Sequence, residues 1–187
     1  MAQDIYDPAF VASLFDRCSN RYRRWSAVSS FGFVWLWRKQ CVDRLVGQSN
    51  VARIHEGTLS PRIPKVTQVI DLMAGTGEVW PHVLAAFPRA QITAIDISPA
   101  MHAEAITKLH GTRAHKINHL TANALDDDLP ANTADLLVAT FGLKTFNKEQ
   151  QTVLAGQIAR ILMPGGSFSL IEASDPIGWP LRPFYRA

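Results

Sequence analysis

The chain contains 187 residues, of which 47% are hydrophobic and 19% are charged, with a formal net charge of +3. This composition excludes an intrinsically disordered chain and predicts one domain with a sizeable core. The longest apolar run, residues 31–37, is far shorter than the ~20 residues that a membrane span needs. Because the first residues lack the pattern of a secretory signal, we expect a cytoplasmic protein whose two cysteines, Cys18 and Cys41, are free thiols.

Positive charge is concentrated in the first third of the chain. Residues 1–65 contain ten Lys and Arg against five Asp and Glu, a net of +5, whereas residues 66–187 contain nine against eleven, a net of −2. A basic segment of this kind can contact an anionic membrane surface or nucleic acid. The same charges also suit the solvated faces of ordinary helices, which is the simpler interpretation.

Two helices are expected at the start of the chain. Apolar residues recur every three or four positions over residues 8–25, and Asp7 before Pro8 is typical of a helix start. A second helix is predicted over residues 33–46, ending at Gly47. Residues 47–65 contain Gly, Ser, Asn and Pro without a clear period and indicate a linker. Residues 1–65 are therefore interpreted as a helical cap and linker.

The rest of the chain alternates strands with helices. Strands are expected at 66–72, 91–95, 117–120, 135–141 and 167–173, and helices at 78–87, 99–110 and 148–162, the last closed by Pro-Gly-Gly at 164–166. This order is typical of βαβ units that form a parallel sheet covered on both faces. Residues 66–187 are therefore predicted to form a Rossmann-like, doubly wound, mostly parallel α/β domain.

A glycine turn follows the first predicted strand, in the segment Val69 to Glu78. Gly75 and Gly77 lack a Cβ, so the backbone there can take positive φ or approach a ligand closely. A dinucleotide fingerprint requires a third glycine, but Trp80 occupies that position, and no P-loop sequence occurs in the chain. The turn therefore favours a ligand without a pyrophosphate.

The second strand ends in Asp96, nineteen residues after Gly77. A carboxylate at this position can accept hydrogen bonds from both hydroxyls of a ribose. Together with the glycine turn it indicates a nucleoside-bearing cofactor. The alternative is that the glycines only make a tight turn and that Asp96 caps the helix that begins near Pro99.

At this point the chain resembles the class I S-adenosylmethionine-dependent methyltransferases, and more narrowly the ubiquinone/menaquinone biosynthesis C-methyltransferase family. The resemblance covers nearly the whole chain. It rests on Phe15-Asp16-Arg17, Tyr22, Ser30-Phe31-Gly32, Trp37-Arg38, residues 71–78, Asp96-Ile97, Met101, Asn123-Ala124, Leu129-Pro130, Phe141-Gly142-Leu143, residues 160–166, Glu172 and Pro176.

The resemblance implies S-adenosyl-L-methionine as the cofactor and assigns its contacts. The glycine turn would pass under the ribose and methionine, Asp96 would hold the ribose hydroxyls, and Phe141 would lie near the sulfonium and the acceptor. Ile97 and Met101 would pack on the adenine, while Asn123 and the Ala124 backbone would face its edge. The expected cofactor-binding residues are Asp71, Ala74, Gly75, Thr76, Gly77, Asp96, Ile97, Met101, Asn123, Ala124 and Phe141.

The chain departs from the family pattern on the side expected to face the acceptor. After Gly142-Leu143 the family has Arg-Asn, whereas this chain has Lys144-Thr145. The family also has Tyr-Asp where this chain has Tyr22-Arg23, and Asn where this chain has Ser26. Lysine keeps the positive charge but not the planar fork of arginine. Two further strands of the family fold have no counterpart before Ala187. Either the chain is a fragment or the domain lacks these strands. In both cases another copy of the chain is expected to complete the sheet edge or the lid, which predicts a homo-oligomer.

Lys144 and Tyr22 are the candidate catalytic residues. Lys144 would stabilise a phenolate that forms on an aromatic acceptor, and Tyr22 would position the hydroxyl of that acceptor. The alternative for Lys144 is an exposed loop lysine. No His or Cys pair has ligand spacing together with a third partner, so no metal is expected. The run Asp126-Asp127-Asp128 is interpreted as solvated turn carboxylates, with a Mg²⁺ site as the alternative.

Three functions remain open. The first is C-methylation of a quinol or related phenolic ring, and the second is O- or N-methylation of another small molecule. The third is a cofactor-binding protein without activity. The aromatic residues at 25, 31, 33, 35 and 37 would line a flat acceptor or pack the cap on the sheet, and the basic cap would touch a membrane that holds lipid-soluble quinones. Nucleic-acid methylation is disfavoured, because no Asn-Pro-Pro-aromatic sequence occurs.

Overall fold

The computed structural model describes residues 4–55, 66–108, 114–126 and 129–173. The chain begins with two helices, α1 (Pro8–Ser29) and α2 (Phe33–His55). The predicted start of α1 is confirmed, because the Asp7 side chain accepts hydrogen bonds from the backbone N–H groups of Ala9 and Phe10 at 2.8 and 3.1 Å. Pro8 occupies the first turn, where a missing N–H costs nothing.

The predicted end of the second helix at Gly47 is wrong, since α2 continues to His55. A glycine inside a helix costs only about 1 kcal/mol relative to alanine. Adding residues to a helix that already exists is easy compared with starting one. The preceding turns of α2 are firmly anchored, because Cys41, Val42 and Leu45 are buried in the core. Of the predicted linker, residues 56–65 lie outside the described residues.

Five parallel strands form the sheet, in the order β3-β2-β1-β4-β5. They are β1 (Gln68–Leu72), β2 (Gln91–Asp96), β3 (Ile117–Thr121), β4 (Ala134–Thr140) and β5 (Leu162–Ile171). After its exposed first residue, Gln68, the central strand β1 is apolar except for Asp71, and its last four residues are buried. This is the pattern of a strand covered on both faces. The predicted α/β fold with a parallel sheet is confirmed.

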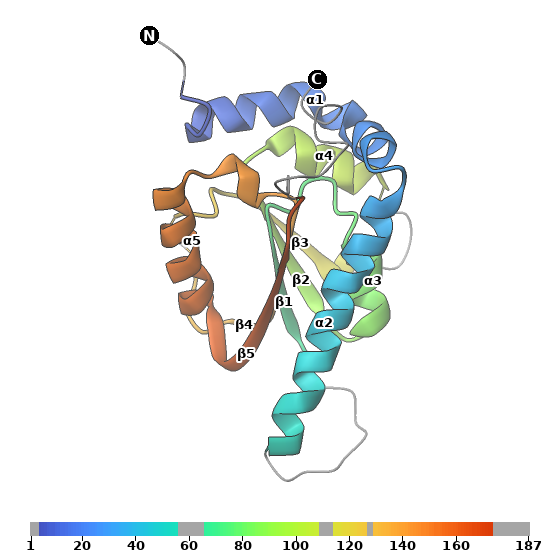
Figure 1. Cartoon of the computed structure of the whole chain (residues 1–187), viewed down its shortest axis with the longest axis vertical. Helices are drawn as coiled ribbons and strands as arrows, with labels where there is room; N and C mark the ends of the chain where they lie inside the picture. Colours follow the sequence, from blue (N-terminus) through green and yellow to red (C-terminus); the bar gives the residue numbers. More distant parts are fainter. Residues whose placement is uncertain (1–3, 56–65, 109–113, 127–128, 174–187) are drawn as a thin grey trace, which may run out of the picture.

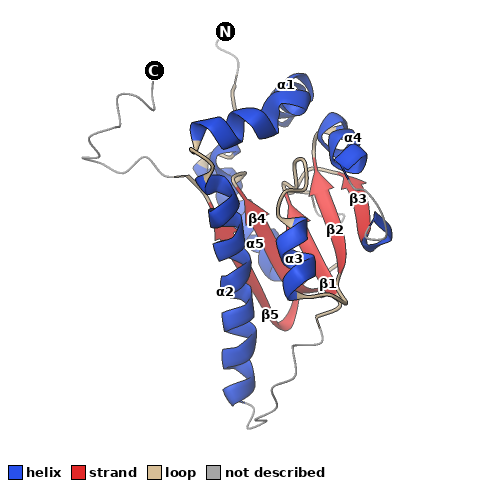
Figure 2. Ribbon diagram, turned by 90° about the vertical axis from the view of Figure 1, so that its right-hand side faces the viewer, coloured by secondary structure: helices blue, strands red, loops and turns tan. Residues whose placement is uncertain are grey.

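Helices cover both faces of the sheet (Figure 1). On one face α2 and α3 (Trp80–Ala86) pack over Val69 and Ile92, and on the other α5 (Lys148–Ile161) packs over Ile70 and Leu137. Neighbouring residues of a strand point to opposite faces, so Val69 and Ile70 belong to different cores. Helix α4 (Pro99–Lys108) follows β2, and α1 lies across it at the carboxyl ends of the strands (Figure 2).

The last strand begins earlier than predicted. We expected residues 164–166 to close the helix, but α5 ends at Ile161 and β5 begins at once with Leu162. The strand passes through Pro164-Gly165-Gly166 with an irregular pairing against β4, where the register shifts between Ala134 and Leu136. Gly165 has φ +81°, which explains glycine there, because L side chains rarely adopt this conformation.

The strand order reverses direction at β1, in the middle of the sheet: β2 and β3 lie on one side of it, and β4 and β5 lie on the other. The connection from β1 leads to β2 on one side, whereas β4 pairs with β1 on the other. In open α/β sheets the crevice at such a switch point, beyond the carboxyl ends of the strands, is where ligands bind. The fold therefore places the glycine turn and Asp96 at the expected ligand site.

Candidate functional site

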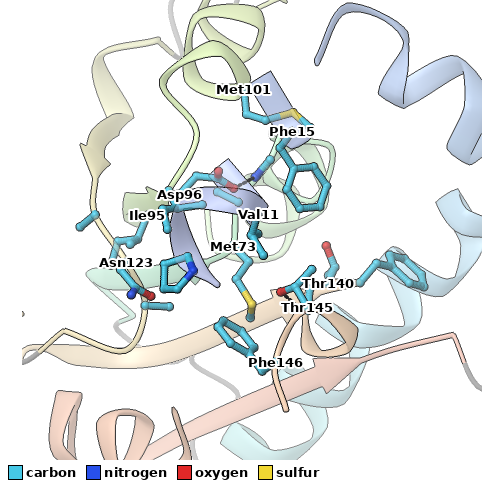
Figure 3. Close-up of a pocket in the computed structure, with 18 of the residues that line it drawn as sticks. Val11, Phe15, Met73, Ile95, Asp96, Met101, Asn123, Thr140, Thr145 and Phe146 are labelled. Carbon is cyan, nitrogen blue, oxygen red and sulfur yellow. Dashed lines mark hydrogen bonds between the residues drawn. The ribbon is translucent and has the colours of Figure 1, made fainter. Parts of the chain in front are cut away.

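A cavity lies at the carboxyl ends of β1, β2 and β4, beneath α1 (Figure 3). It holds about 780 Å³ of empty space, part of which is open to solvent. Asp96, Met101 and Asn123 lie toward one end, and Thr140, Thr145 and Phe146 toward the other. The predicted site residues that line it are Tyr22, Ala74, Gly75, Asp96, Ile97, Met101, Asn123, Ala124 and Phe141.

The two glycines of the turn play different parts. Gly75 has φ +55°, and a Cβ built on it would meet nothing within 4 Å, so its backbone faces open space. Gly77 has φ +74°, and a Cβ there would lie 2.4 Å from the ring of Trp80. Gly75 therefore leaves room for a ligand on the cavity wall, whereas Gly77 allows the indole to pack behind the turn.

Asp96 connects the glycine turn to the start of α4. One carboxylate oxygen accepts from the Gly75 N–H at 2.7 Å and the other from the Ser98 N–H at 2.9 Å. Burial raises the pKa of Asp96, and these two backbone hydrogen bonds lower it in part. Each carboxylate oxygen retains a further acceptor site. The two carboxylate oxygens of Asp96 can thus accept hydrogen bonds from the two hydroxyls of a ribose while they still hold the glycine turn in place.

Trp80 explains the unusual third position of the glycine motif. Its indole N–H donates to the Asp71 carboxylate at 2.8 Å, behind the cavity wall. Asp71 is 1% exposed, and its other carboxylate oxygen has no hydrogen-bond partner among the described residues. Burial raises the pKa of Asp71 to about 8. Asp71, Thr76 and Gly77 thus support the turn from behind instead of lining the cavity.

One end of the cavity suits a flat nitrogenous base. Ile97, Met101 and Ala124 give it apolar walls, and Asn123 provides a polar edge. The Asn123 side-chain oxygen accepts from the Leu125 N–H at 3.1 Å, which fixes its orientation. The open backbone face at Gly75, the carboxylate of Asp96 and this apolar slot together fit a nucleoside cofactor.

Charged and aromatic side chains gather on the opposite wall. Arg38 of α2 forms an ion pair with Glu78 at 3.1 Å, and its guanidinium carbon lies 5.2 Å from the centre of the Phe141 ring. Tyr22 lines the same wall, and burial raises its pKa to about 12. Glu78 also accepts a hydrogen bond from the hydroxyl of Thr76, which ties this wall to the glycine turn.

Helix α1 closes the cavity from above. Tyr6, Val11 and Phe15 line it from the α1 region. The helix is held by Asp16, which accepts from the Ser98 hydroxyl at 2.6 Å and from the Ala100 N–H at 3.3 Å. The helical spacing of the apolar residues in α1 was the available signal for this lid, but spacing alone does not show what the apolar face covers.

Sequence reasoning gave no role to Arg38 and Glu78. They are forty residues apart, on a helix of the cap and on the glycine turn, and they meet only because α2 packs beside α3. A single sequence contains no signal for such a contact. The pairing explains why Arg38 is only 5% exposed, since arginine is rarely buried unless paired.

Lys144 lies outside the cavity wall. Its side chain is exposed, and its backbone N–H donates to Glu172 at 3.1 Å. It belongs to a short 3-10 turn, Leu143–Thr145, closed by a hydrogen bond from the Thr145 hydroxyl to the Gly142 carbonyl at 2.7 Å. This turn directs Thr145 and Phe146 to the cavity in place of Lys144.

Among the described residues, neither the histidines nor Asp126 lines the cavity, and His110 lies outside the described part of the chain. His102 and His119 pack on each other with ring centres 5.0 Å apart, and neither lines the cavity. Within the described residues, no group of three or more His, Cys, Asp or Glu side chains is placed to hold a metal ion. Asp127, Asp128 and Pro176 lie outside the described residues. Among the helices that the structure describes, none combines the length and hydropathy of a membrane span.

The sheet order, the glycine turn after β1 and the carboxylate at the end of β2 are those of the class I S-adenosylmethionine-dependent methyltransferase fold. A solved structure with this fold is a chain of the complex between the Haloferax volcanii Trm112 methyltransferase activator and a methyltransferase. It aligns with a TM-score of 0.53 and 20% identity over 83% of this chain and 58% of its own.

Comparison of the sequence leads to a narrower assignment. Residues 3–187 match the ubiE/COQ5 methyltransferase family, and the chain belongs to it. The ubiquinone/menaquinone biosynthesis C-methyltransferase of Syntrophotalea carbinolica is 30% identical over 173 residues, or 92% of this chain. The demethylmenaquinone methyltransferase of Listeria welshimeri is 27% identical over 90% of this chain. The chain spans 65% of the length of each of these relatives.

The family assignment confirms three predictions: the fold, the family itself and S-adenosylmethionine as the cofactor.

Proposed function

We propose that the chain is an S-adenosylmethionine-dependent methyltransferase of a small aromatic acceptor, and that it C-methylates a quinol or phenolic ring in the cytoplasm. The observation that carries this proposal is one continuous cavity with two chemically different ends. One end offers a carboxylate and an apolar slot, and the other offers aromatic rings with a buried cation. Such a cavity brings a nucleoside cofactor and a flat acceptor face to face.

The residues that would hold the cofactor are those on the wall around the glycine turn. Ala74 and Gly75 would pass under the ribose and methionine, and Asp96 would accept the ribose hydroxyls. Ile97 and Met101 would enclose the adenine, with Asn123 and Ala124 at its edge. Asp71, Thr76 and Gly77 would act indirectly, by holding the turn. When bound, the cofactor supplies a methyl group on an activated sulfur.

The protein's part in methyl transfer is positioning and the exclusion of water. Phe141 has φ +64°, an unusual conformation for a bulky residue, and its ring lies beside the Arg38 guanidinium on the cavity wall. The lid α1 covers the cavity and is anchored to α4 through Asp16. Tyr22 has a raised pKa and stays protonated at neutral pH, so its O–H is a donor for an acceptor oxygen.

The first test is calorimetric titration with S-adenosylhomocysteine. We expect micromolar binding by the chain, no binding of NADH, and a loss of at least about tenfold in affinity in Asp96→Asn, which removes the charge but keeps the shape. Asp126→Asn, in an exposed turn, is the matched control and should bind as the original chain does. No binding of S-adenosylhomocysteine would contradict the proposal.

The acceptor is tested by incorporation of a labelled methyl group into a panel of phenols and quinols. Fragmentation of the product distinguishes a new carbon–carbon bond from methylation at oxygen or nitrogen. A product methylated at oxygen or nitrogen would contradict C-methylation and support the alternative of an O- or N-methyltransferase. Binding of S-adenosylhomocysteine without any product would support a cofactor-binding protein instead.

We also propose that the turn between α1 and α2 contacts anionic membranes. Trp25, Phe31 and Trp35 are exposed by 67%, 85% and 61% in this region, and Arg23 and Arg24 are exposed beside them. Aromatic tips flanked by basic residues suit the interface of an anionic bilayer. Co-sedimentation with vesicles containing phosphatidylserine should be lost in Trp25→Ser/Phe31→Ser and absent with phosphatidylcholine alone. Equal pelleting in both vesicle types would contradict this contact.

We propose a homo-oligomer that forms through the edge of the sheet at β5. In the described sheet β5 is the last strand in the order, and Met163 and Phe168 on it are 40% and 48% exposed. An open edge with apolar side chains can pair with a second copy. Light scattering should give a mass of at least two chains at micromolar concentration. A monomeric mass would remove this proposal without affecting the catalytic one.

A further inference from the structure

Arg38 is a buried cation with unused hydrogen-bonding capacity. It lines the cavity, is 5% exposed, and its Nη2 contacts Glu78 at 3.1 Å. Its Nε is buried and has no hydrogen-bond partner among the described residues. A guanidinium has five N–H donors and no acceptor, and buried donors are normally satisfied. An unsatisfied donor on a cavity wall is therefore a place for a ligand oxygen.

The neighbours of Arg38 define what kind of oxygen fits. Glu78 already takes up part of the side-on fork that Nε and Nη2 form, so a bidentate carboxylate is poorly suited. One oxygen on a flat ring is a better fit, because Nε offers a single N–H and the cavity beside it has aromatic walls, which include Phe15, Tyr22 and Phe141. Tyr22, on the same cavity, adds a second neutral donor.

Resting on the function proposed above, we propose that Arg38 binds the ionised phenolic oxygen of the acceptor. The guanidinium would favour the phenolate over the phenol, which raises electron density at the ring carbons next to that oxygen. Glu78 would moderate this effect by neutralising part of the positive charge. The site would thus select acidic phenols and hydroquinones over their O-methylated or uncharged analogues.

The test uses 4-nitrophenol, whose anion is followed by its absorbance, with 4-nitroanisole as the probe that cannot ionise. The pKa of 4-nitrophenol is measured free and bound, with and without S-adenosylhomocysteine. We expect the pKa of the bound probe to be about one unit lower, which corresponds to a tenfold preference for the anion. We also expect 4-nitroanisole to bind at least about tenfold more weakly than the anion.

Variants separate a binding role from a structural one. Glu78→Gln alone should lower the pKa of bound 4-nitrophenol further, because Arg38 then keeps its full charge. Arg38→Met combined with Glu78→Gln should abolish the shift without leaving a buried carboxylate unpaired. Arg38→Lys should retain a reduced shift. Lys148→Met, at an exposed position on the first turn of α5 and off the cavity wall, is the matched control and should behave as the original chain.

Three results would overturn the proposal: no binding of 4-nitrophenol, no change in its pKa on binding, or a change that persists in Arg38→Met/Glu78→Gln. The thermal unfolding of each variant is recorded, and Glu78→Gln tests the proposal even if the double variant does not fold. Failure of S-adenosylhomocysteine to bind would refute the proposed function instead. The titrations without that ligand still decide whether Arg38 binds a phenolate.

Discussion

The two ends of the cavity are built in different ways. The cofactor end comes from turns that follow consecutive strands, over residues 73–124, and each turn contributes residues adjacent in the chain. The acceptor end combines α1, α2 and the end of β4, with Tyr22 and Arg38 more than a hundred residues from Phe141. A local motif can specify the first end, whereas the second exists only after the cap has packed on the sheet.

The largest effect is expected at the glycine turn of the cofactor end, where the variants Gly77→Ala and Gly75→Ala are compared with each other. At Gly77 a Cβ would lie 2.4 Å from the Trp80 ring at φ +74°, and we expect a loss of about 2–4 kcal/mol in the free energy of unfolding. At Gly75 a Cβ meets open space at φ +55°, so the loss is about 1–2 kcal/mol.

Urea denaturation measures the free energy of unfolding of both variants, and titration with S-adenosylhomocysteine then measures their cofactor affinity. Gly75→Ala should lose cofactor affinity despite its milder effect on folding, because its new methyl group enters the cavity. Equal stability of the two variants would mean that Trp80 moves freely, and the assignment of separate roles to the two glycines would fail.

Asp71→Asn tests the buried carboxylate beneath the turn. The pKa of Asp71 is raised to about 8 in the folded chain against an ordinary value of 3.8, so between these values the folded state holds a proton that the unfolded state has released. Stability therefore falls as the pH rises from about 4 to 8. Asparagine removes this dependence and still accepts from the Trp80 indole.

We expect Asp71→Asn to be more stable than the original chain by at least about 1 kcal/mol at pH 8. In a protein of this size that corresponds to roughly 2–4 °C in Tm. The advantage should vanish near pH 4. Burial lowers the pKa of His102 and His119, but their effect below pH 6.5 is common to both proteins and cancels. A constant difference across the whole pH range would contradict the assignment.

Asp16→Ala tests how the cap is joined to the cofactor end. Asp16 accepts from the hydroxyl of Ser98 and the N–H of Ala100 at the start of α4. Losing this cap should cost about 1 kcal/mol of stability and weaken S-adenosylhomocysteine binding several-fold, because the lid loses its anchor. Asp7→Ala removes a cap of similar strength from α1 itself. It should cost similar stability, measured by urea denaturation, with a smaller change in affinity.

Lys144→Met should have the smallest effect. The side chain is exposed and lies off the cavity wall, so the stability should change by less than about 0.5 kcal/mol. Methylation of a phenol, followed by labelled methyl incorporation, should also be unchanged. A large loss of activity would show that the acceptor reaches the turn after β4 and would return Lys144 to the catalytic group.

Much of the cofactor end was predictable because its residues follow directly from strand positions. Once β1 and β2 are recognised, Gly75 and Asp96 must lie side by side at the carboxyl edge of a parallel sheet, and their 2.7 Å hydrogen bond shows that they do. Even at the cofactor end, the sequence did not predict which residues of the motif are buried behind the turn. Asp71 and Thr76 belong to the same motif but turn away from the cavity, because a motif does not state which side of a turn each residue faces.

The alternation of strands and helices, the glycine turn and the carboxylate after β2 are properties of the sequence alone, because they depend on local periodicity and spacing. The family was recognisable from a resemblance carried by short motifs along the chain, such as residues 71–78 and Phe141-Gly142-Leu143. Tertiary packing decided the rest: that α2 continues past Gly47, that Lys144 points outward, and that Arg38 meets Glu78 under the lid. These outcomes depend on contacts between distant segments, whose free energies no local pattern contains.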